Sequence, residues 1–345
     1  MKKQFDVVGS SKIYFIISGA LILLGIICTF VFGVEVDIQF SGGTMLNYAY
    51  TNEVDTHEFA DKAEEFLGQE VTYTEGSDYS TGKKTIKLYL TDKTGLTSDK
   101  QVEVSDALQE YFTDSDVVLL ESSDVSPSSG KEFFQKCLVA VAFSSILLII
   151  YITARFKKIS GLSAGIFGIV ALIHDIFIVY VTFVVFQLPI NANFMAVVLT
   201  ILGYSINDTT VIYDRLRENK KIYGVSLTTR ELMNKSINQS LTRSLNTSIT
   251  TILSMVVVTI VAVIYRVDSI ITFSFPLIIG MISGVYSSIC LAGPLWVLWD
   301  EHKEKKNGKI SDKGGKHENK KKSIIEEVIE EEDYIEDFDD ITEET

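Results

Sequence analysis

The chain has 345 residues, of which 47% are hydrophobic and 22% are charged, and its formal net charge is −14 at pH 7. These averages conceal long uncharged apolar runs that alternate with highly charged segments, which excludes an ordinary soluble globular domain. The acidic balance gives no indication of a nucleic-acid partner. The four histidines lack metal-ligand spacing with cysteines or carboxylates, so we expect neither a metal nor another cofactor.

Six runs are long and apolar enough to cross a bilayer, because a helix needs about 20 apolar residues to do so. The first run is longer than the apolar part of an ordinary signal peptide, and no small-residue cleavage site follows it. We therefore expect a polytopic α-helical membrane protein whose first span is a retained anchor. The expected spans cover residues 13–34, 133–154, 160–186, 194–213, 246–265 and 270–299.

Lysine and arginine residues gather in three segments, at 2–12, 155–158 and 215–243. With six spans, all three segments fall on the same side of the membrane. Because basic residues in short loops stay on the cytoplasmic side, we expect both termini in the cytoplasm.

Residues 35–132, between the first two spans, carry 21 acidic and 7 basic residues and are long enough for a small extracytoplasmic domain. We expect its first helix to be capped by Asp55 or Thr56, and its second to open with a capping box of Ser98 and Gln101. The resulting βαββαβ order predicts a ferredoxin-like α+β domain. Alternation and helical periodicity predict strands at 44–50, 70–74, 84–90 and 117–121, and helices at 55–67 and 98–112.

The last segment, residues 300–345, is first basic and then acidic, with twelve acidic and no basic residues after position 325. Its few large apolar residues favour a disordered cytoplasmic tail. Apart from its two acidic segments the chain has a net charge of +12, which suits contact with anionic lipids of the bilayer. We therefore divide the chain into four parts: an N-terminus with the first span (1–34), the outer domain (35–132), a five-helix region (133–299) and the tail.

Two carboxylates fall inside the apolar runs. Asp208 lies seven residues before Arg215, which places it about 10 Å inside the cytoplasmic boundary at 1.5 Å per residue. Asp175 follows His174 well inside the third span. An aspartate at such depth costs about 2.5–3.5 kcal/mol to insert, so it faces the bundle interior and serves either an ion pathway or a pairing between helices. Both interpretations remain open for the two residues.

Polar residues accompany Asp208 along the fourth span. Thr200, Tyr204 and Asn207 recur with it at spacings of three and four, which predicts a polar face that could hold water. The fifth span begins with a run of hydroxyl and amide side chains, and Arg243 enters it at the same end of the membrane. We therefore expect Asp208 and Arg243 to meet across the helix interface.

Two further patterns are typical of close helix packing in membranes. Gly161-Leu-Ser-Ala-Gly165 and Gly280-Met-Ile-Ser-Gly284 place small residues four apart on one helix face. No strand precedes either pattern and no lysine of a phosphate loop follows, so neither predicts a nucleotide site.

Short motifs at the edges of the outer domain, Asp37-Ile-Gln-Phe-Ser-Gly-Gly-Thr44 and Val125-Ser-Pro-Ser-Ser-Gly-Lys-Glu132, accompany GYSIND at 203–208 and RLREN at 215–219. With these motifs the chain resembles the SecF branch of the SecD/SecF family of bacterial protein-export proteins, from the first span to the sixth. Two positions depart from the family pattern: Gln39 stands in place of an Asp, and Ser126 in place of a Gly. The matching motif residues are Gly42, Gly43, Pro127, Gly130 and Gly203.

The resemblance implies a multi-pass subunit of the bacterial cytoplasmic membrane that works with a SecD partner on the SecYEG channel, and so indirectly with the SecA ATPase, during export of preproteins. In SecF proteins an Asp of the fourth span and an Arg of the fifth serve proton-driven export, and the matching positions here are Asp208 and Arg243. Their separation is one residue longer than in the relative compared. Protonation would break such a pair, and the rearrangement would move the outer domain that holds the emerging polypeptide.

Two alternatives remain open. A proton-driven exporter of small molecules or lipids in the same superfamily would share a relay Asp on its fourth span, although such exporters commonly carry two six-helix repeats in one chain. A passive membrane scaffold would use Asp208 only to join helices. No pattern in the sequence indicates chemistry on a covalent bond, so we do not expect an enzyme.

Overall fold

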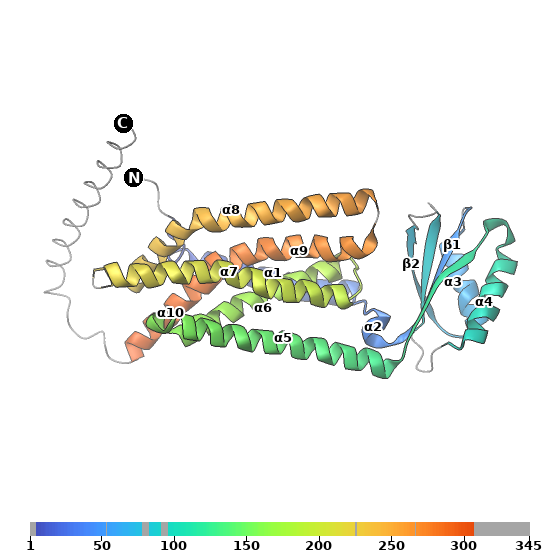
Figure 1. Cartoon of the computed structure of the whole chain (residues 1–345), viewed down its shortest axis with the longest axis horizontal. Coiled ribbons are helices and arrows are strands. Elements are labelled where there is room, and N and C mark those ends of the chain that lie inside the picture. Colours follow the sequence, from blue (N-terminus) through green and yellow to red (C-terminus); the bar gives the residue numbers. More distant parts are fainter. Residues whose placement is uncertain are drawn as a thin grey trace, which may run out of the picture.

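The structure is a computed structural model that describes residues 5–52, 54–77, 83–90, 96–224, 226–265 and 267–306. A helical bundle occupies one end of an elongated molecule and a small α+β domain the other (Figure 1). Six helices of the bundle are long and apolar enough to cross a membrane, judged by length and composition. This confirms a mostly helical membrane protein with a small antiparallel sheet. The helices are α1 (Ser11–Phe32), α5 (Pro127–Arg155), α6 (Gly161–Val185), α7 (Ala192–Tyr223), α8 (Thr229–Ile264) and a sixth, Ser269–Lys303, within α9 (Asp268–Ser287), the π-helix η3 (Ser288–Ala292) and α10 (Gly293–Lys306).

The six helices divide into an inner and an outer group. About half of the apolar window is buried in α6, α7 and the sixth helix (50%, 56% and 56%), against 11%, 6% and 11% in α1, α5 and α8. The outer helices expose leucine, isoleucine, valine and phenylalanine side chains along their length, as a lipid-facing surface does. Helices α6 and α7 and the sixth helix therefore form the inside of the bundle.

Helices α7 and α8 extend well past the hydrocarbon. Their 32 and 36 residues span about 48 and 54 Å, whereas the hydrocarbon core of a bilayer is ~30 Å thick. Their charged ends are rich in good helix formers, and Thr228 and Glu231 form a capping box at the start of α8. Only residues 224–228 separate the two helices, so most of the segment expected between the fourth and fifth spans is helical.

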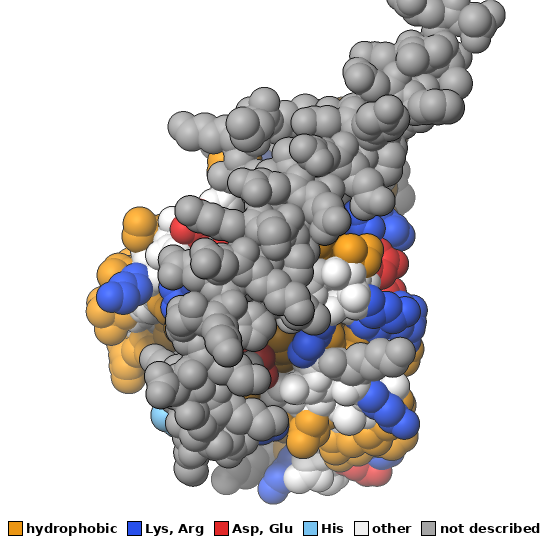
Figure 2. Space-filling view, turned by 90° about the vertical axis from the view of Figure 1, so that its left-hand side faces the viewer, with side chains coloured by type: hydrophobic (Ala, Val, Ile, Leu, Met, Phe, Trp, Pro, Cys, Tyr) orange, Lys and Arg blue, Asp and Glu red, His pale blue; other side chains and the backbone are white. Residues whose placement is uncertain are grey.

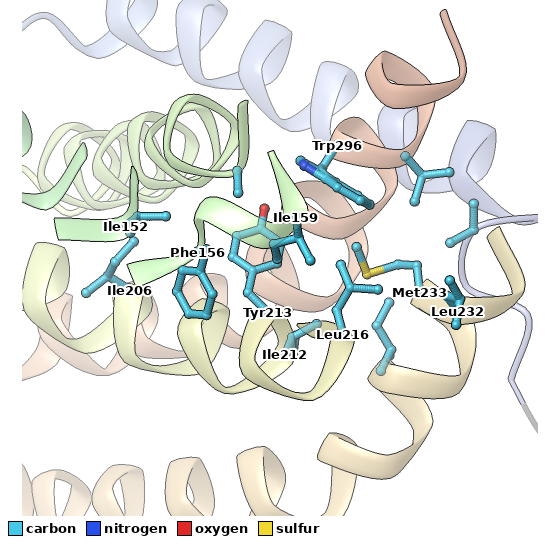
Figure 3. Close-up of a cluster of buried hydrophobic side chains, with 14 of the residues drawn as sticks. Ile152, Phe156, Ile159, Ile206, Ile212, Tyr213, Leu216, Leu232, Met233 and Trp296 are labelled. Carbon is cyan, nitrogen blue, oxygen red and sulfur yellow. The ribbon is translucent and has the colours of Figure 1, made fainter. Parts of the chain in front are cut away.

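A hydrophobic cluster fixes this end of the bundle (Figure 3). Tyr213 of α7 lies at its centre, with its ring edge-on to Phe156 at 5.9 Å and its hydroxyl donating to the Ala292 carbonyl oxygen at 3.5 Å. Trp296 of α10 and Met233 of α8 belong to the same cluster. The cluster ties α5, α7, α8 and α10 together just beyond the polar interior.

The outer domain contains a four-stranded antiparallel sheet in the order β2-β3-β1-β4. Alternate side chains of β1 and β3 join residues of both helices in one buried core. Asp55 caps α3 by accepting from the amides of His57 and Glu58, as expected. Its elements are β1 (Gly43–Tyr50), α3 (Thr56–Leu67), β2 (Val71–Ser77), β3 (Lys84–Leu90), α4 (Ser98–Tyr111), η1 (Thr113–Ser115) and β4 (Val118–Val125).

Two expectations about ends of helices were wrong. The capping box at Ser98 does not form: Thr97 is the N-cap, it makes no side-chain cap, and Gln101 donates instead to the Leu96 carbonyl. At the C-terminal end, α10 continues to Lys306, so the first residues of the expected tail are helical. Residues 307–345, including the acidic run, lie outside the described part of the chain.

Candidate functional site

The carboxylate of Asp175 on α6 lies inside the bundle, and its side chain is fully buried. Three serine hydroxyls donate to it: Ser205 of α7 at 2.9 Å, and Ser283 and Ser287 of α9, each at 2.7 Å. His174 completes the cluster, with Nδ1 3.3 Å from the carboxylate. Among the described residues no lysine or arginine pairs with Asp175. The polar groups around its carboxylate are the three serine hydroxyls and the His174 imidazole.

Small residues allow this cluster to form. A Cβ on Gly284 would lie 3.1 Å from Ser205 and 3.7 Å from the Asp175 carboxylate, and a Cβ on Gly280 would overlap Ile201 of α7. The pattern Gly280 to Gly284 therefore brings α9 close enough for its serines to reach α6. On α6 itself, Gly161 approaches the backbone of α5 in the same way. Both predicted packing motifs are confirmed.

The polar network continues toward the π-helix. Ser288, its first residue, accepts a hydrogen bond from Thr209 at 2.9 Å and donates to the Ser205 carbonyl oxygen at 3.1 Å. A π-turn interrupts the regular hydrogen bonding of a helix, and such turns are frequent at functional sites. The change of helical register thus lies directly beside the residues that hold Asp175.

Asp208 lies on a different face of α7, against α8. Its side chain is buried, with 3% exposure, and accepts one hydrogen bond, from Ser248 at 3.2 Å. Ser248 is the last of four buried serines at spacings of four along α8. The others are Ser236, Ser240 and Ser244.

The expected contact between Asp208 and Arg243 is absent: Arg243 is exposed and makes no ion pair with any described residue. The helical phase explains this difference. Ser244 and Ser248 face α7, and Arg243 is rotated by about 100° from Ser244, toward the outside of the bundle. The sequence signal that locates the partner of Asp208 is therefore the repeat of serines at spacings of four along α8, and not the depth of Arg243.

The expected polar face of α7 is split between two environments. Tyr204 is partly buried, and its hydroxyl has no hydrogen-bond partner within the described residues. Thr200, Gly203 and Asn207 are exposed and lie on one outer face of the helix. A Cβ on Gly203 would meet nothing within 4 Å. These residues do not surround Asp208; they form an open polar strip on the bundle surface.

The neighbouring helix α8 adds to this strip. Asn246, Thr247, Thr250 and Ser254 are exposed on it. The hydroxyls of Thr250 and Ser254 donate to carbonyls of their own helix. The side-chain amides of Asn207 and Asn246 have no partner among the described residues. We call Thr200, Gly203, Asn207, Arg243, Asn246, Thr247, Thr250 and Ser254 the polar strip.

The motifs that flank the outer domain meet each other at its base. Gly42, at φ 77°, lies so close to Pro127 that a Cβ on it would overlap the proline backbone. A Cβ on Gly130 would come within 3.0 Å of the Phe40 carbonyl oxygen, and one on Gly43 would overlap that of Leu90. The glycines therefore allow α2 (Ile38–Ser41) to lie directly against the start of α5. We call this contact the basal joint.

Further contacts fix the connection from α1 to the basal joint. Asp37 donates its amide to the Ile190 carbonyl, and Ile190 donates to the Glu35 carbonyl, so this connection pairs with the loop between α6 and α7. Gln39, the departure from the family pattern, accepts from the amide of Ala192 at the start of α7. The side-chain carbonyl oxygen of Gln39 thus accepts a hydrogen bond that the carboxylate of the family's Asp could also accept.

A cleft of about 370 Å³ lies between this connection and the outer edge of the sheet. Its walls include Glu35 and Asp37 on one side and Thr72 to Thr74 of the edge strand β2 with Tyr89 on the other. Partial desolvation in the cleft raises the pKa of the Glu35 carboxyl, although the residue is still exposed, and burial raises the pKa of the Tyr89 phenol. The cleft exposes an unpaired strand edge beside two acidic side chains.

The described part of the bundle thus contains two buried carboxylates, Asp175 and Asp208, that serine hydroxyls hold. No group of three or more His, Cys, Asp or Glu that could hold a metal ion occurs in the part of the chain that the structure describes. The fold and the buried carboxylates define a multi-pass membrane protein with an outer α+β domain and a polar interior.

Comparison with known proteins identifies the family. The family described as "Protein export membrane protein SecD/SecF, C-terminal" matches residues 103–302. The translocase subunit SecF of Alicyclobacillus acidocaldarius is 32% identical over 308 residues, which cover 89% of this chain and 96% of that one. The chain therefore belongs to the SecF branch of the SecD/SecF family and is an accessory subunit of the Sec protein translocase.

Longer relatives contain the same unit. SecDF of Bacillus subtilis is 32% identical over 329 residues, which cover 88% of this chain and 39% of that one. The crystal structure of SecDF from Thermus thermophilus, a translocon-associated membrane protein, superposes with a TM-score of 0.72 at 27% identity, covering 87% of this chain and 39% of that one. The matches to protein-export subunits do not favour the small-molecule exporter alternative.

Proposed function

We propose that the chain couples the transmembrane gradient of protons or sodium ions to preprotein export through Asp175 and Asp208. The observation that carries this proposal is the Asp175 carboxylate, held inside the bundle by three serine hydroxyls from two other helices. A carboxylate without a cationic partner changes its interactions with α7 and α9 when it binds a proton or a cation. The helices that hold it are the ones that must rearrange.

The available energy suits a two-state rearrangement. An ion that crosses 100 mV supplies ~2.3 kcal/mol, and each pH unit adds about 1.4 kcal/mol. Together these bias an equilibrium by a factor of order tens to hundreds, so export requires repeated cycles. The π-helix between α9 and α10 is the element that we expect to change register, because Ser288 connects it to both Thr209 and Ser205.

Arg243 enters this cycle in a second state. In the state described above, Ser248 is the hydrogen-bond partner of Asp208 and Arg243 is exposed. A rotation of α8 about its axis would exchange Ser248 for Arg243 as the partner. The peripheral position of α8, with 11% of its apolar window buried, supports such a movement.

A SecD-like subunit covers the polar strip in this proposal. Unpartnered amides of Asn207 and Asn246 are costly in hydrocarbon, so this face needs protein or water rather than acyl chains. Gly203 leaves a flat surface on α7 against which a partner helix can pack closely. The assembled pair works on the SecYEG channel, with the SecA ATPase acting on the same preproteins.

The outer domain receives the emerging polypeptide. Its assignment as ferredoxin-like is supported by the chain order β1-α3-β2-β3-α4-β4 and the sheet order β2-β3-β1-β4. The edge strand β2 borders the cleft of about 370 Å³, so an extended segment can add to the sheet there. In this proposal the membrane part consists of residues 1–34 and 133–299, the tail consists of residues 300–345, and both termini lie in the cytoplasm.

A reconstituted system tests this function. We expect Asp175→Asn and Asp208→Asn each to lose at least tenfold of the gradient-dependent translocation by the full chain assembled with a SecD-like subunit and the channel, while assembly persists. Asp214→Asn is a matched control, because Asp214 lies on the same helix but pairs with Arg155 and Arg217 outside the polar interior. Full gradient dependence in both variants would instead support the passive scaffold.

A further inference from the structure

A second pocket lies at the end of the bundle opposite the outer domain. It has a volume of about 770 Å³ and opens between the end of α5, the short helix η2 (Lys157–Ile159), the start of α6 and α10. Neither the polar interior nor the basal joint contributes to it. Figure 2 looks onto this end, where lysine and arginine side chains lie among hydrophobic ones.

One part of the pocket is apolar and faces the lipid. Leu162 and Ile166 of α6 are 59% and 45% exposed, and Trp299 of α10 is 50% exposed. The Trp299 ring lies 6.0 Å from that of Phe167, so the two aromatic residues form one wall. Apolar side chains at this level of the bundle suit acyl chains rather than a water-soluble ligand.

The other part of the pocket is cationic and rich in hydrogen-bond donors. Lys157 and Lys303 line it, and neither makes an ion pair with any described residue. His302 lies beside them, and none of the described residues that line the pocket is acidic. Glu301, one of the acidic residues of α10 close to this wall, is held on another side by two hydrogen bonds from Arg230.

The start of α6 adds further donors. Ser160, at φ 60° and ψ 57°, is the N-cap residue but makes no side-chain cap, so the first amides of the helix lack that acceptor. Amides at a helix N-terminus favour a phosphate group. Thr153 lines the same pocket, and its hydroxyl is buried and has no partner among the described residues.

We propose that this pocket binds an anionic phospholipid, with its phosphate on Lys157, Lys303 and the start of α6 and an acyl chain along Phe167, Ile166 and Trp299. Basic pockets between membrane helices commonly take such headgroups. The lipid lies in the cytoplasmic leaflet. This placement rests on the proposed function in one respect only, the cytoplasmic position of both termini. The site itself requires no ion coupling, so loss of either proposal leaves the other in place.

Native mass spectrometry of the purified full-length chain tests the site, with dioleoylphosphatidylglycerol as the probe and dioleoylphosphatidylcholine and inorganic phosphate as comparisons. We expect one phosphatidylglycerol to bind preferentially. The double substitution Lys157→Gln, Lys303→Gln should weaken binding at least fivefold. The control Lys220→Gln, Lys221→Gln removes two exposed lysines at the same end of the bundle outside the pocket, and should change it less than twofold.

A steric variant keeps the charges and closes the acyl part: Ile166→Trp should also weaken binding at least fivefold. Equal losses in the two lysine pairs would overturn the site, because they would indicate unspecific attraction. So would equal binding of phosphatidylcholine, or competition by inorganic phosphate at similar concentration. A marked increase in lipid binding when Glu330, Glu331 and Glu332 are changed to Gln in the full chain would identify the acidic tail as the occupant and also overturn the proposal.

Discussion

The hydroxyl of Ser287 on α9 donates to the carboxylate of Asp175 on α6 at 2.7 Å, in the interior of the membrane bundle. Two more serines converge on the same carboxylate. The Asp175 carboxylate therefore joins α6, α7 and α9, and a change in its hydrogen-bond partners affects all three helices. Because these hydrogen bonds join the helices, the free energy of unfolding reports whether the site around Asp175 is intact.

We expect Asp175→Leu to lower the free energy of unfolding by about 2–3 kcal/mol, because three buried hydroxyls lose an acceptor and only partly find new ones. Ser287→Ala should cost about 1 kcal/mol. Ser254→Ala is the control, since its hydroxyl bonds only to the Thr250 carbonyl of its own helix. Unfolding in mixed micelles, followed by circular dichroism, measures these changes. A cost for Asp175→Leu no larger than for the control would contradict the role of the cluster.

A double-mutant cycle separates the two candidate partners of Asp208. Ser248→Ala combined with Asp208→Leu should give a coupling energy of about 0.5–1.5 kcal/mol, since the leucine removes the acceptor of the hydrogen bond between the two side chains. Arg243→Gln combined with Asp208→Leu should give less than about 0.5 kcal/mol in the isolated chain. The same unfolding assay applies. A larger coupling to Arg243 than to Ser248 would mean that the ion pair dominates in the resting chain.

The basal joint gives a matched pair of glycines. Gly42 and Gly33 have similar backbone angles, φ 77° and 75°, but a Cβ would overlap Pro127 at Gly42 and would meet nothing within 4 Å at Gly33. Gly33→Ala should therefore cost about 1–2 kcal/mol for its backbone conformation alone. Gly42→Ala should cost a further 1–3 kcal/mol or so, from overpacking. Thermal unfolding of both full-length variants compares them, and equal costs would argue against a close contact at the joint.

The cleft beside β2 predicts a pH dependence of stability. Partial desolvation in the cleft raises the pKa of Glu35 in the folded chain, so its proton is bound more tightly there than in the unfolded chain. The stability linked to this proton is fully present below the unfolded pKa, which is about 4.5, and is lost as pH rises through the raised folded value. Glu35→Gln should therefore raise the melting temperature at pH 8 and leave it nearly unchanged at pH 4.

Asp116 provides a control of opposite sign for that experiment. A hydrogen bond from Lys83 lowers the pKa of Asp116, so its contribution is present above the unfolded pKa and is lost as pH falls through the lowered folded value. Asp116→Asn should lower the melting temperature at pH 8, with a difference that disappears in acid. Parallel pH profiles for the two variants would show that at least one of the two carboxyls does not behave as its surroundings require.

Hydropathy and alternation predicted the membrane spans and the order of strands and helices in the outer domain, because long apolar runs and period-two patterns are local signals. The residues that surround the carboxylates were harder to find. Asp175 and Asp208 are visible in sequence as charges in apolar runs, but their partners are serines, which are common in membrane helices. Ser205, Ser283 and Ser287 come from two helices that only the fold brings together.

Arg243 illustrates the limit of spacing arguments between helices. Its depth in the membrane was compatible with a contact to Asp208, but depth does not fix which side of a helix faces a neighbour. The four-residue repeat from Ser236 to Ser248 does fix that side, and it places Arg243 outward. Likewise Gly42 and Pro127 were recognised as separate motifs, while their mutual contact depends on two segments far apart in the chain.

The geometry of the basal joint restricts how the outer domain can move. The domain is attached to the membrane part by two covalent connections that cross at Gly42 and Pro127, in direct contact. A rigid body attached at two adjacent points keeps one easy rotation, about the line through them, whereas tilting in other directions strains the backbone. We therefore expect a small shift at the ends of α1 or α5 to turn the domain about this line, with a displacement that grows with distance from it.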